Sequence, residues 1–293
     1  MRPENARLST GAVVANRFRL EHPVGVGSLG VVWRGKELST KRRAALKFLR
    51  GASRESAECE RRFMREAHAL IRVRHPNVIG MRDALTLPSG THMLVLDMLT
   101  GETLADRLTR LGPLSFTELV QIFMPLCSAL AAMHQVGIVH RDLKPSNIYL
   151  TEDRERLRVL DFGAAMSLTT SAGDPLQVFA GEVVGTPFYM APEQALADPL
   201  LDHRADIFSL GVLAYEALTG RRPNSGDSIG QVLKCVLSGP PPRLSLPELP
   251  DELVEMVHRM LASEADDRPD SAAEVWRLLA RYSQRGEIRA LVR

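Results

Sequence analysis

Three chemically useful side chains lie within residues 140–147, which read His-Arg-Asp-Leu-Lys-Pro-Ser-Asn. The Asp142 carboxylate can accept a proton from a hydroxyl nucleophile, and Lys144 can reach a phosphoryl group that is being transferred. The amide oxygen of Asn147 can bind Mg²⁺, a hard cation that prefers oxygen ligands. The segment therefore indicates phosphoryl transfer. Because mixed charges and proline are also common in surface loops, the rest of the chain has to decide between the two interpretations.

This segment resembles the H-R-D-L-x-x-x-N catalytic loop of the eukaryotic-type (Hanks-type) protein kinases. The resemblance implies a bilobal α+β fold with a small N-terminal antiparallel sheet, one main helix and a larger, mostly helical C-terminal lobe. It also implies transfer of the γ-phosphoryl group of ATP, with Mg²⁺ as cofactor. Lys144 at its spacing, together with Thr186 in Gly-Thr-Pro, matches the serine/threonine members, and the compact, Arg- and Ala-rich sequence is most similar to the bacterial ones.

A glycine-rich segment, Gly25-x-Gly27-x-x-Gly30-x-Val32, lies between two predicted strands. Glycines allow backbone N–H groups to approach phosphates without interference from a Cβ atom. The pattern alone is weak, because it also occurs in dinucleotide-binding folds. In those folds a helix follows the third glycine, whereas a strand is predicted here, which argues against a Rossmann NAD enzyme.

Two further motifs supply an ammonium and a carboxylate. Lys47 ends Ala-Leu-Lys on the third predicted strand and resembles the family's phosphate-binding lysine, which an ion pair with Glu66 on the following helix would orient. Asp161-Phe162-Gly163 begins fourteen residues after Asn147. By the resemblance, Asp161 is the principal Mg²⁺ ligand and Phe162 packs under the helix that carries Glu66.

Residues 185–193, Gly-Thr-Pro-Phe-Tyr-Met-Ala-Pro-Glu, match the family's substrate-docking segment. Glu193 would need a buried cation, and Arg268 is the residue that the family pattern supplies. Asp206, at the start of an apolar helix, is expected to anchor the backbone of the catalytic loop. The motifs follow the family order over about residues 18–281.

The resemblance implies a complete set of site residues. The catalytic set is Asp142, Lys144, Lys47 and Glu66, and the metal ligands are Asn147 and Asp161. The residues expected around ATP are Val24, Gly25, Gly27, Gly30, Val32, Ala45, Lys47, Asp97, Leu99 and Tyr149, with Leu96 as the gatekeeper at the back of the adenine pocket. An apolar spine between the lobes is expected from Leu70, Met81, His140 and Phe162.

The elements that must position these residues follow from periodicity. Alternation and β-formers predict strands at 18–21, 31–34, 44–49, 78–84 and 92–97, with a helix at 55–73 whose apolar face carries Phe63, Ala67, Leu70 and Ile71. Helices at 116–136, 207–218, 253–261 and 272–282 and a hairpin from 147–150 and 156–160 are predicted beyond Gly101. The expected domains are a flexible tail at 1–16, a kinase domain at 17–281 (N-lobe 17–99, C-lobe 100–281) and a tail at 282–293.

Composition limits the remaining classes. The chain has 293 residues and a formal net charge of +2, so neither nucleic acid nor a membrane surface is indicated as a partner. Its three cysteines are far apart and form no C-x-x-C pair, which fits reduced thiols and a cytoplasmic location. The most apolar stretch, residues 207–218, is shorter than the roughly 20 residues of a membrane span, so no membrane segment is predicted.

Two questions stay open at this stage. In the family, an arginine such as Arg141 pairs with a phosphate about three residues before the Gly-Thr pair, and Glu182 stands there instead. We hypothesise that Glu182 supplies a permanent negative partner; the alternative is autophosphorylation in the hydroxyl cluster Ser167, Thr169, Thr170 and Ser171.

The alternative in a different class is a pseudokinase scaffold that binds partners without turnover. The retention of Lys47, Asp142 and Asp161 argues against it. The expected partners are protein substrates with Ser or Thr acceptors, and a homodimer that phosphorylates itself is left open.

Overall fold

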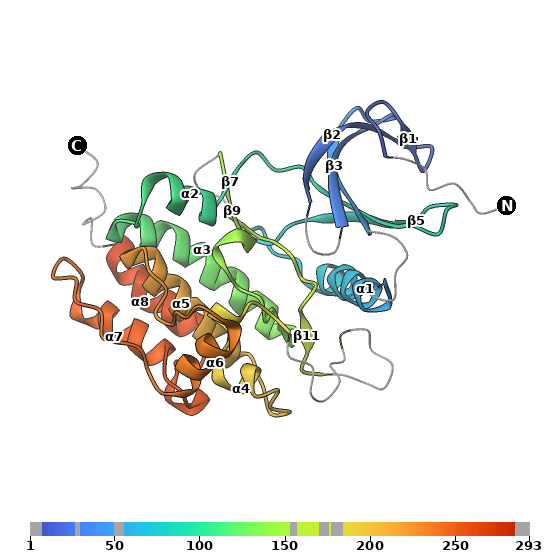
Figure 1. Cartoon of the computed structure of the whole chain (residues 1–293). Coiled ribbons are helices and arrows are strands. Elements are labelled where there is room, and N and C mark those ends of the chain that lie inside the picture. The colour runs from blue at the N-terminus through green and yellow to red at the C-terminus, as the bar shows by residue number, and fades with distance from the viewer. Residues whose placement is uncertain are drawn as a thin grey trace.

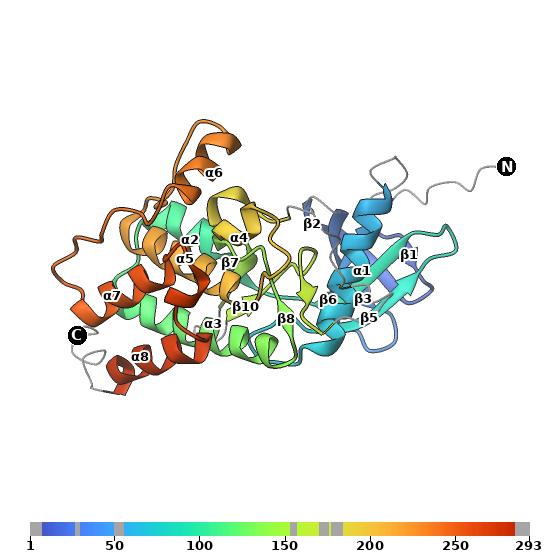
Figure 2. The same cartoon turned by 90° about the horizontal axis from the view of Figure 1, so that it is seen from below.

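The computed structural model describes residues 8–26, 30–49, 56–152, 157–169, 176 and 184–284. These residues form an N-terminal lobe that contains a sheet and a larger C-terminal lobe that is mostly helical (Figure 1). The view from below shows the same two lobes, with α1 on the side of the sheet (Figure 2). The predicted bilobal α+β fold is confirmed.

The N-terminal lobe is built on one six-stranded antiparallel sheet in the order β1-β2-β3-β4-β6-β5. The strands predicted at 18–21, 31–34, 44–49 and 92–97 lie within β2, β3, β4 and β6. β5 begins at Met81 rather than at the predicted Val78, which instead forms an isolated bridge with Val159. The bounds are β1 (Val13–Val14), β2 (Phe18–Val26), β3 (Gly30–Glu37), β4 (Arg43–Leu49), β5 (Met81–Thr86) and β6 (His92–Asp97).

Strand β4 shows how alternation separates the two faces of the sheet. Leu46 and Phe48 are buried in an apolar cluster that belongs to the N-terminal lobe alone. Ala45 and Leu49 pack against the second, larger cluster, which continues through the C-terminal lobe. Because successive side chains of a strand point to opposite faces, Lys47 lies on the same face as Ala45 and Leu49. The charged residue of β4 is thereby turned toward the junction of the two lobes.

Helix α1 (Ser56–Arg72) packs its apolar stripe against the larger cluster. Phe63, Ala67 and Leu70 are buried as predicted, whereas Ile71 is exposed. At 100° per residue Ile71 lies about 80° around the helix from Phe63, at the edge of the stripe. Glu66 lies on the buried side and is itself buried.

The C-terminal lobe surrounds helix α5, which is buried along almost its whole length as predicted for residues 207–218. The helix ends at Gly220, whose φ of 70° and N–H bond to the Glu216 carbonyl form a left-handed glycine cap. The helices are α2 (Leu104–Leu111), α3 (Phe116–Gln135), α4 (Pro192–Ala195), α5 (Arg204–Thr219), α6 (Ile229–Leu237), α7 (Asp251–Met260) and α8 (Ala272–Gln284).

Short strands hold the loops between the lobes. β8 (Ile138–Val139) pairs with β11 (Met166–Ser167), and β9 (Ile148–Thr151) pairs with both β7 (Gly101–Thr103) and β10 (Leu157–Val159). The β9 and β10 pair confirms the predicted hairpin. Since β8 precedes residue 140 and β9 follows residue 147, the segment between them is held at both ends.

Residues at both ends that the sequence assigned to the tails belong to folded elements. Val13 and Val14, placed in the tail at 1–16, form β1 and pair with β2, and Val14 is buried. Tyr282, placed in the tail at 282–293, is buried in α8, which continues to Gln284. Both corrections have one cause: each segment covers apolar surface that only the folded lobe presents.

Among the described residues, α3 is the one helix whose length and composition would allow it to cross a membrane. Half of that stretch is buried inside the protein. Leu126, Leu130 and Met133 of α3 are fully buried in the larger cluster. Core helices pass the same test of length and composition. The absence of a membrane segment stays a prediction.

Candidate active site

The catalytic loop gathers the predicted polar side chains around Asp142. Lys144 Nζ donates to Asp142 Oδ2 at 2.6 Å, and the Thr186 hydroxyl donates to Asp142 Oδ1 at 2.6 Å. Lys144 Nζ also lies 2.8 Å from Thr186 Oγ1. Asn147 Nδ2 donates to the Asp142 carbonyl at 2.8 Å, so the amide is oriented with its nitrogen toward the loop. Both oxygens of the Asp142 carboxylate are thus held in position.

Asp206 anchors this loop from α5, as predicted. Its carboxylate is fully buried and accepts hydrogen bonds from the backbone N–H of His140 at 2.8 Å and of Arg141 at 2.9 Å. Burial raises the pKa of Asp206, but the hydrogen bond from His134 Nε2 at 2.9 Å and the backbone donors outweigh it, so the pKa lies below its usual value. The anchor is therefore ionised at neutral pH.

Sequence reasoning missed two residues of this support. His134 provides the third contact on Asp206, and Gln194 Nε2 donates to the carbonyls of Arg141 at 2.6 Å and Val184 at 2.7 Å. Gln194 is almost completely buried. The position of Gln194 directly after Ala-Pro-Glu was a usable signal. A polar side chain next to that motif is held close to backbone groups with which it can form hydrogen bonds.

The docking segment comes close to the catalytic loop at Gly185, and only glycine fits there. Its φ of 125° is unfavourable for residues with a side chain, and a Cβ there would lie 2.6 Å from the Arg141 carbonyl oxygen. The close approach brings the segment that starts at Val184 against the catalytic loop. Thr186 consequently reaches Asp142.

The second part of the site joins the two lobes through Lys47. Its Nζ lies 2.5 Å from Glu66 Oε2 on α1 and 3.8 Å from Asp161 Oδ1. The predicted ion pair between Lys47 and Glu66 is therefore formed, and the Asp161 carboxylate faces the same ammonium. Residues from β4, α1 and the loop after β10 meet at one point.

The charges of Lys47 and Asp161 at this point stabilise each other. Burial lowers the pKa of Lys47, but the Glu66 and Asp161 carboxylates outweigh it and hold that pKa above its usual value. Burial raises the pKa of Asp161, but Lys47 and the Gly163 N–H bring it below its usual value. The ammonium and the Asp161 carboxylate are both charged at neutral pH. An ionised carboxylate in this position suits a hard cation.

Asp161 is brought next to the catalytic loop by its neighbours. The Leu160 N–H donates to the Asn147 carbonyl at 2.8 Å, and the Leu160 carbonyl lies 3.0 Å from His140 Nε2. Asp161 itself has a φ of 59°, a left-handed conformation that is uncommon for a residue other than glycine. The backbone turn directs the carboxylate back toward Lys47.

The predicted apolar spine is assembled in one cluster. The His140 and Phe162 rings meet edge to face with centroids 5.0 Å apart. Leu70 and Phe162 are buried in the larger cluster, and Met81 packs against it. Phe162 and Phe63 of α1 belong to this same large cluster, and the packing of Phe162 under that helix stays a prediction.

The described residues predicted around ATP lie on β2, β3, β4, β6 and β9 and, for Leu99, in the segment between β6 and β7. Val32 is paired with Lys47 and with Gly25, and Ala45 is paired with Leu96. Asp97 ends β6, and Leu99 follows it before β7. Val24 is exposed, while Val32, Ala45, Leu99 and Tyr149 are half-buried. Tyr149 on β9 donates its hydroxyl to the Gly101 carbonyl at 2.9 Å.

The two described glycines of the glycine-rich segment differ in their surroundings. A Cβ on Gly25 would meet no atom within 4 Å. A Cβ on Gly30 would lie 1.9 Å from the Phe48 carbonyl oxygen, so Gly30 is required by the packing of β3 on β4. Gly27 lies outside the described residues. The approach of this segment to phosphate stays a prediction for Gly25 and Gly27 alike.

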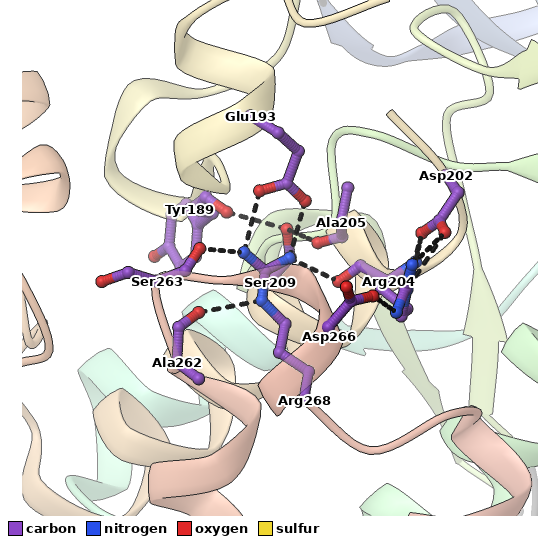
Figure 3. Close-up of polar contacts among 10 residues, drawn as sticks. All are labelled: Tyr189, Glu193, Asp202, Arg204, Ala205, Ser209, Ala262, Ser263, Asp266 and Arg268. Carbon is purple, nitrogen blue, oxygen red and sulfur yellow. Dashed lines mark hydrogen bonds and ion pairs between the residues drawn. The ribbon is translucent and has the colours of Figure 1, made fainter. Parts of the chain in front are cut away.

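Glu193 has the buried partner that the sequence predicted. Arg268 Nη1 donates to Glu193 Oε1 at 2.6 Å and Nη2 donates to Oε2 at 2.8 Å (Figure 3). The guanidinium also donates to the carbonyls of Ala262, Ser263 and Arg204. This contact ties the end of the docking segment to α5 and to the loop before α8.

The activation-loop hypotheses are only partly within the described residues. Glu182, Thr170 and Ser171 lie outside them. Arg141 Nη1 lies 3.6 Å from Met166 Sδ. Ser167 is buried and its hydroxyl accepts a bond from Arg72 at 3.2 Å, while Thr169 is exposed. Both hypotheses stay predictions.

The two lobes and the converging side chains define a fold and a site of the protein kinase type. The protein kinase domain family matches residues 18–277. The chain belongs to this family.

Bacterial serine/threonine kinases are among its relatives. The chain is 35% identical to the serine/threonine-protein kinase pkn3 of Myxococcus xanthus over 279 residues, 93% of this chain and 51% of that protein. It is 38% identical to pkn2 of the same organism, with 92% and 32% covered, and 34% identical to PknA of Mycobacterium tuberculosis, with 84% and 57% covered. The chain spans from a third to a little over half of the length of these curated relatives.

These similarities confirm the predicted family, and nothing in them favours a pseudokinase. Because the chain spans only part of these relatives, its serine/threonine kinase activity stays a proposal. Protein kinases as a family use ATP and Mg²⁺ and act on proteins. The roles of the individual residues follow as proposals.

Proposed function

We propose that this chain transfers the γ-phosphoryl group of Mg·ATP to serine or threonine hydroxyls of protein substrates. The observation that carries the proposal is the meeting of Lys47 with two carboxylates, Glu66 at 2.5 Å and Asp161 at 3.8 Å, beside the Asp142 loop. A cation held by a buried carboxylate can bind phosphate without losing its orientation. The second carboxylate, that of Asp161, could bind a metal ion.

The donor set fits magnesium. Asp161 offers an ionised carboxylate, and Asn147, whose nitrogen is turned to Asp142, offers its amide oxygen. The described residues include no cluster of three or more His, Cys, Asp or Glu side chains that could hold a metal ion. Mg²⁺ commonly takes one or two protein ligands and completes its shell with phosphate oxygens and water. Bound there, it would neutralise charge on the phosphates.

The nucleotide would lie between the lobes. Lys47 would contact the phosphates, and the segment from Gly25 to Gly30, with Gly27, would cover them. Val24, Val32 and Ala45 would lie above the adenine and Tyr149 below it, with backbone groups of Asp97 and Leu99 as hydrogen-bonding partners. The support for Val32 and Ala45 is the strand register, which pairs Val32 with Lys47 and Ala45 with Leu96.

Asp142 would orient the acceptor hydroxyl and receive its proton. The hydroxyl oxygen forms the new bond to the γ-phosphorus while the bond to the β,γ-bridging oxygen breaks, and ADP leaves with that electron pair. Lys144, between Asp142 and Thr186, would stabilise the transferred group. Most of the acceleration would come from positioning and electrostatics.

The expected partners are proteins with Ser or Thr acceptors, and a homodimer that phosphorylates itself belongs to the same proposal. The predicted cytoplasmic location stays a prediction.

The test is incorporation of labelled phosphate from γ-labelled ATP and Mg²⁺ into a generic basic protein. We expect the wild-type chain to label serine or threonine, and Asp142→Asn to reduce the label by at least about a hundredfold. Label no higher than that of the variant, with both proteins folded, would favour the scaffold instead.

A further inference from the structure

A cavity of about 460 Å³ adjoins the proposed acceptor position. The catalytic loop borders it at Lys144 and Ser146, and the docking segment borders it at Tyr189. Because Lys144 also donates to Asp142, the cavity begins beside the residue that would orient the acceptor hydroxyl. A substrate side chain close to the acceptor would enter this space.

The carboxylate in the cavity wall belongs to Glu216 of α5 and is already engaged. The Tyr189 hydroxyl donates to Glu216 Oε2 at 2.5 Å, and Arg222 Nε lies 3.9 Å from Glu216 Oε1. Burial and the Glu216 carboxylate both raise the pKa of Tyr189, so its hydroxyl keeps its proton. The Glu216 side chain is 19% exposed. The negative charge is therefore shielded by two partners.

Arg222 is held differently. Its guanidinium carbon lies 3.7 Å from the centroid of the Phe188 ring, a cation–π contact that fixes the plane of the group. The side chain is 38% exposed, and within the described part of the chain its nitrogens make no hydrogen bond. A guanidinium in a fixed plane with available donors suits a carboxylate, which it can bind through two parallel bonds.

Phe188 places this cation near the acceptor. Phe188 follows Thr186 by two residues, so their Cα atoms are at most about 7 Å apart. Thr186 in turn donates to Asp142. Arg222 does not itself line the cavity, but its side chain is 38% exposed against 19% for Glu216, so it is the more accessible charge of the pair. A basic side chain would have to compete with Arg222 and Tyr189 for Glu216.

We infer that Arg222 determines substrate specificity by binding an acidic side chain close to the acceptor Ser or Thr, and that the pairing of Arg222 with Glu216 disfavours a basic one. The inference rests on the proposed kinase activity and adds the chemical class of its substrate. Arg222 acts in substrate binding and takes no part in the transfer itself.

The test uses the whole chain, Mg·ATP and a library of Ser/Thr peptides in which each flanking position in turn carries Glu, Gln or Lys. We expect the wild-type chain to favour Glu over Lys at one position by about tenfold in kcat/KM. Arg222→Gln should abolish that ratio and Arg222→Glu should reverse it at the same position.

The matched control is Arg221→Gln, because Arg221 is also exposed but lies outside the contact with Phe188. It should keep the wild-type ratio. A preference for Lys at every position, or a Glu/Lys ratio that Arg222→Gln leaves unchanged, overturns the inference while the kinase activity stands. Absence of label on every peptide and on the generic protein overturns the proposed function and this inference together.

Discussion

Arg268 and Glu193 are joined through two parallel hydrogen bonds of 2.6 and 2.8 Å. The Arg268 side chain is fully buried, and the Glu193 side chain is 14% exposed. The two residues come from segments far apart in the sequence, so their contact fixes the docking segment relative to the end of the C-terminal lobe. A neighbouring pair, Arg204 and Asp266, offers a comparison at the surface (Figure 3).

Replacing Arg268 with methionine should lower the free energy of unfolding by about 3–5 kcal/mol, because a buried carboxylate and three carbonyls lose their donor. Asp266→Asn should change it by less than about 0.5 kcal/mol, since Asp266 is 90% exposed. Urea unfolding of the three proteins measures both effects. Equal losses in the two variants would contradict the assignment.

Asp206→Asn should destabilise the protein in a pH-dependent way. The folded-state pKa of Asp206 is depressed, so its contribution is present above the unfolded pKa of about 3.9 and is lost as the pH falls further. We expect a deficit of about 2–3 kcal/mol at neutral pH, from lost charge-assisted hydrogen bonds, that shrinks below about pH 4. Unfolding curves across this range, with the exposed Asp227→Asn as control, test it. A deficit that does not vary with pH would count against it.

Lys47→Met should lower kcat/KM by at least about a hundredfold, because the phosphate-facing cation is lost. It also leaves Glu66 buried without a cation, and burial raises the pKa of Glu66. A raised folded-state pKa gives stability that is present at low pH and lost as the pH rises, so the variant should be more stable near pH 5 than near pH 8.

The double variant Lys47→Met with Glu66→Gln removes the titrating group and serves as the control for that pH dependence. Thermal melting at the two pH values shows the difference. If the single and double variants respond alike to pH, Glu66 is not the group responsible.

Gly25 of β2 and Gly30 of β3 should separate stability from nucleotide binding. Gly30→Ala should cost about 1–3 kcal/mol, because its Cβ would overlap the Phe48 carbonyl. Gly25→Ala meets open space and should leave the melting temperature unchanged while raising the KM for ATP several-fold. Melting curves and ATP titrations of both variants decide. An unchanged KM in Gly25→Ala would remove Gly25 from the nucleotide site.

The sequence was sufficient where a local rule or a motif specifies the result. Strand alternation places Lys47 opposite Leu46 and Phe48, and helical spacing places Glu66 beside the buried face that contains Phe63. The same rules failed at Ile71, which is exposed. Periodicity predicts the centre of the apolar stripe of α1 but does not show how far the buried stripe extends around the helix. They also missed β1, because two residues carry no periodic signal.

By itself, the order and spacing of the motifs determined the family, the two lobes and the residues around Asp142, Lys47 and Asp161. Only the tertiary structure decided that His134 and Gln194 support the catalytic loop, and that Arg222 stacks on Phe188. Motifs reflect chemistry that depends on short stretches of chain. These other contacts join distant segments, and their geometry exists only once the helices and loops have packed together.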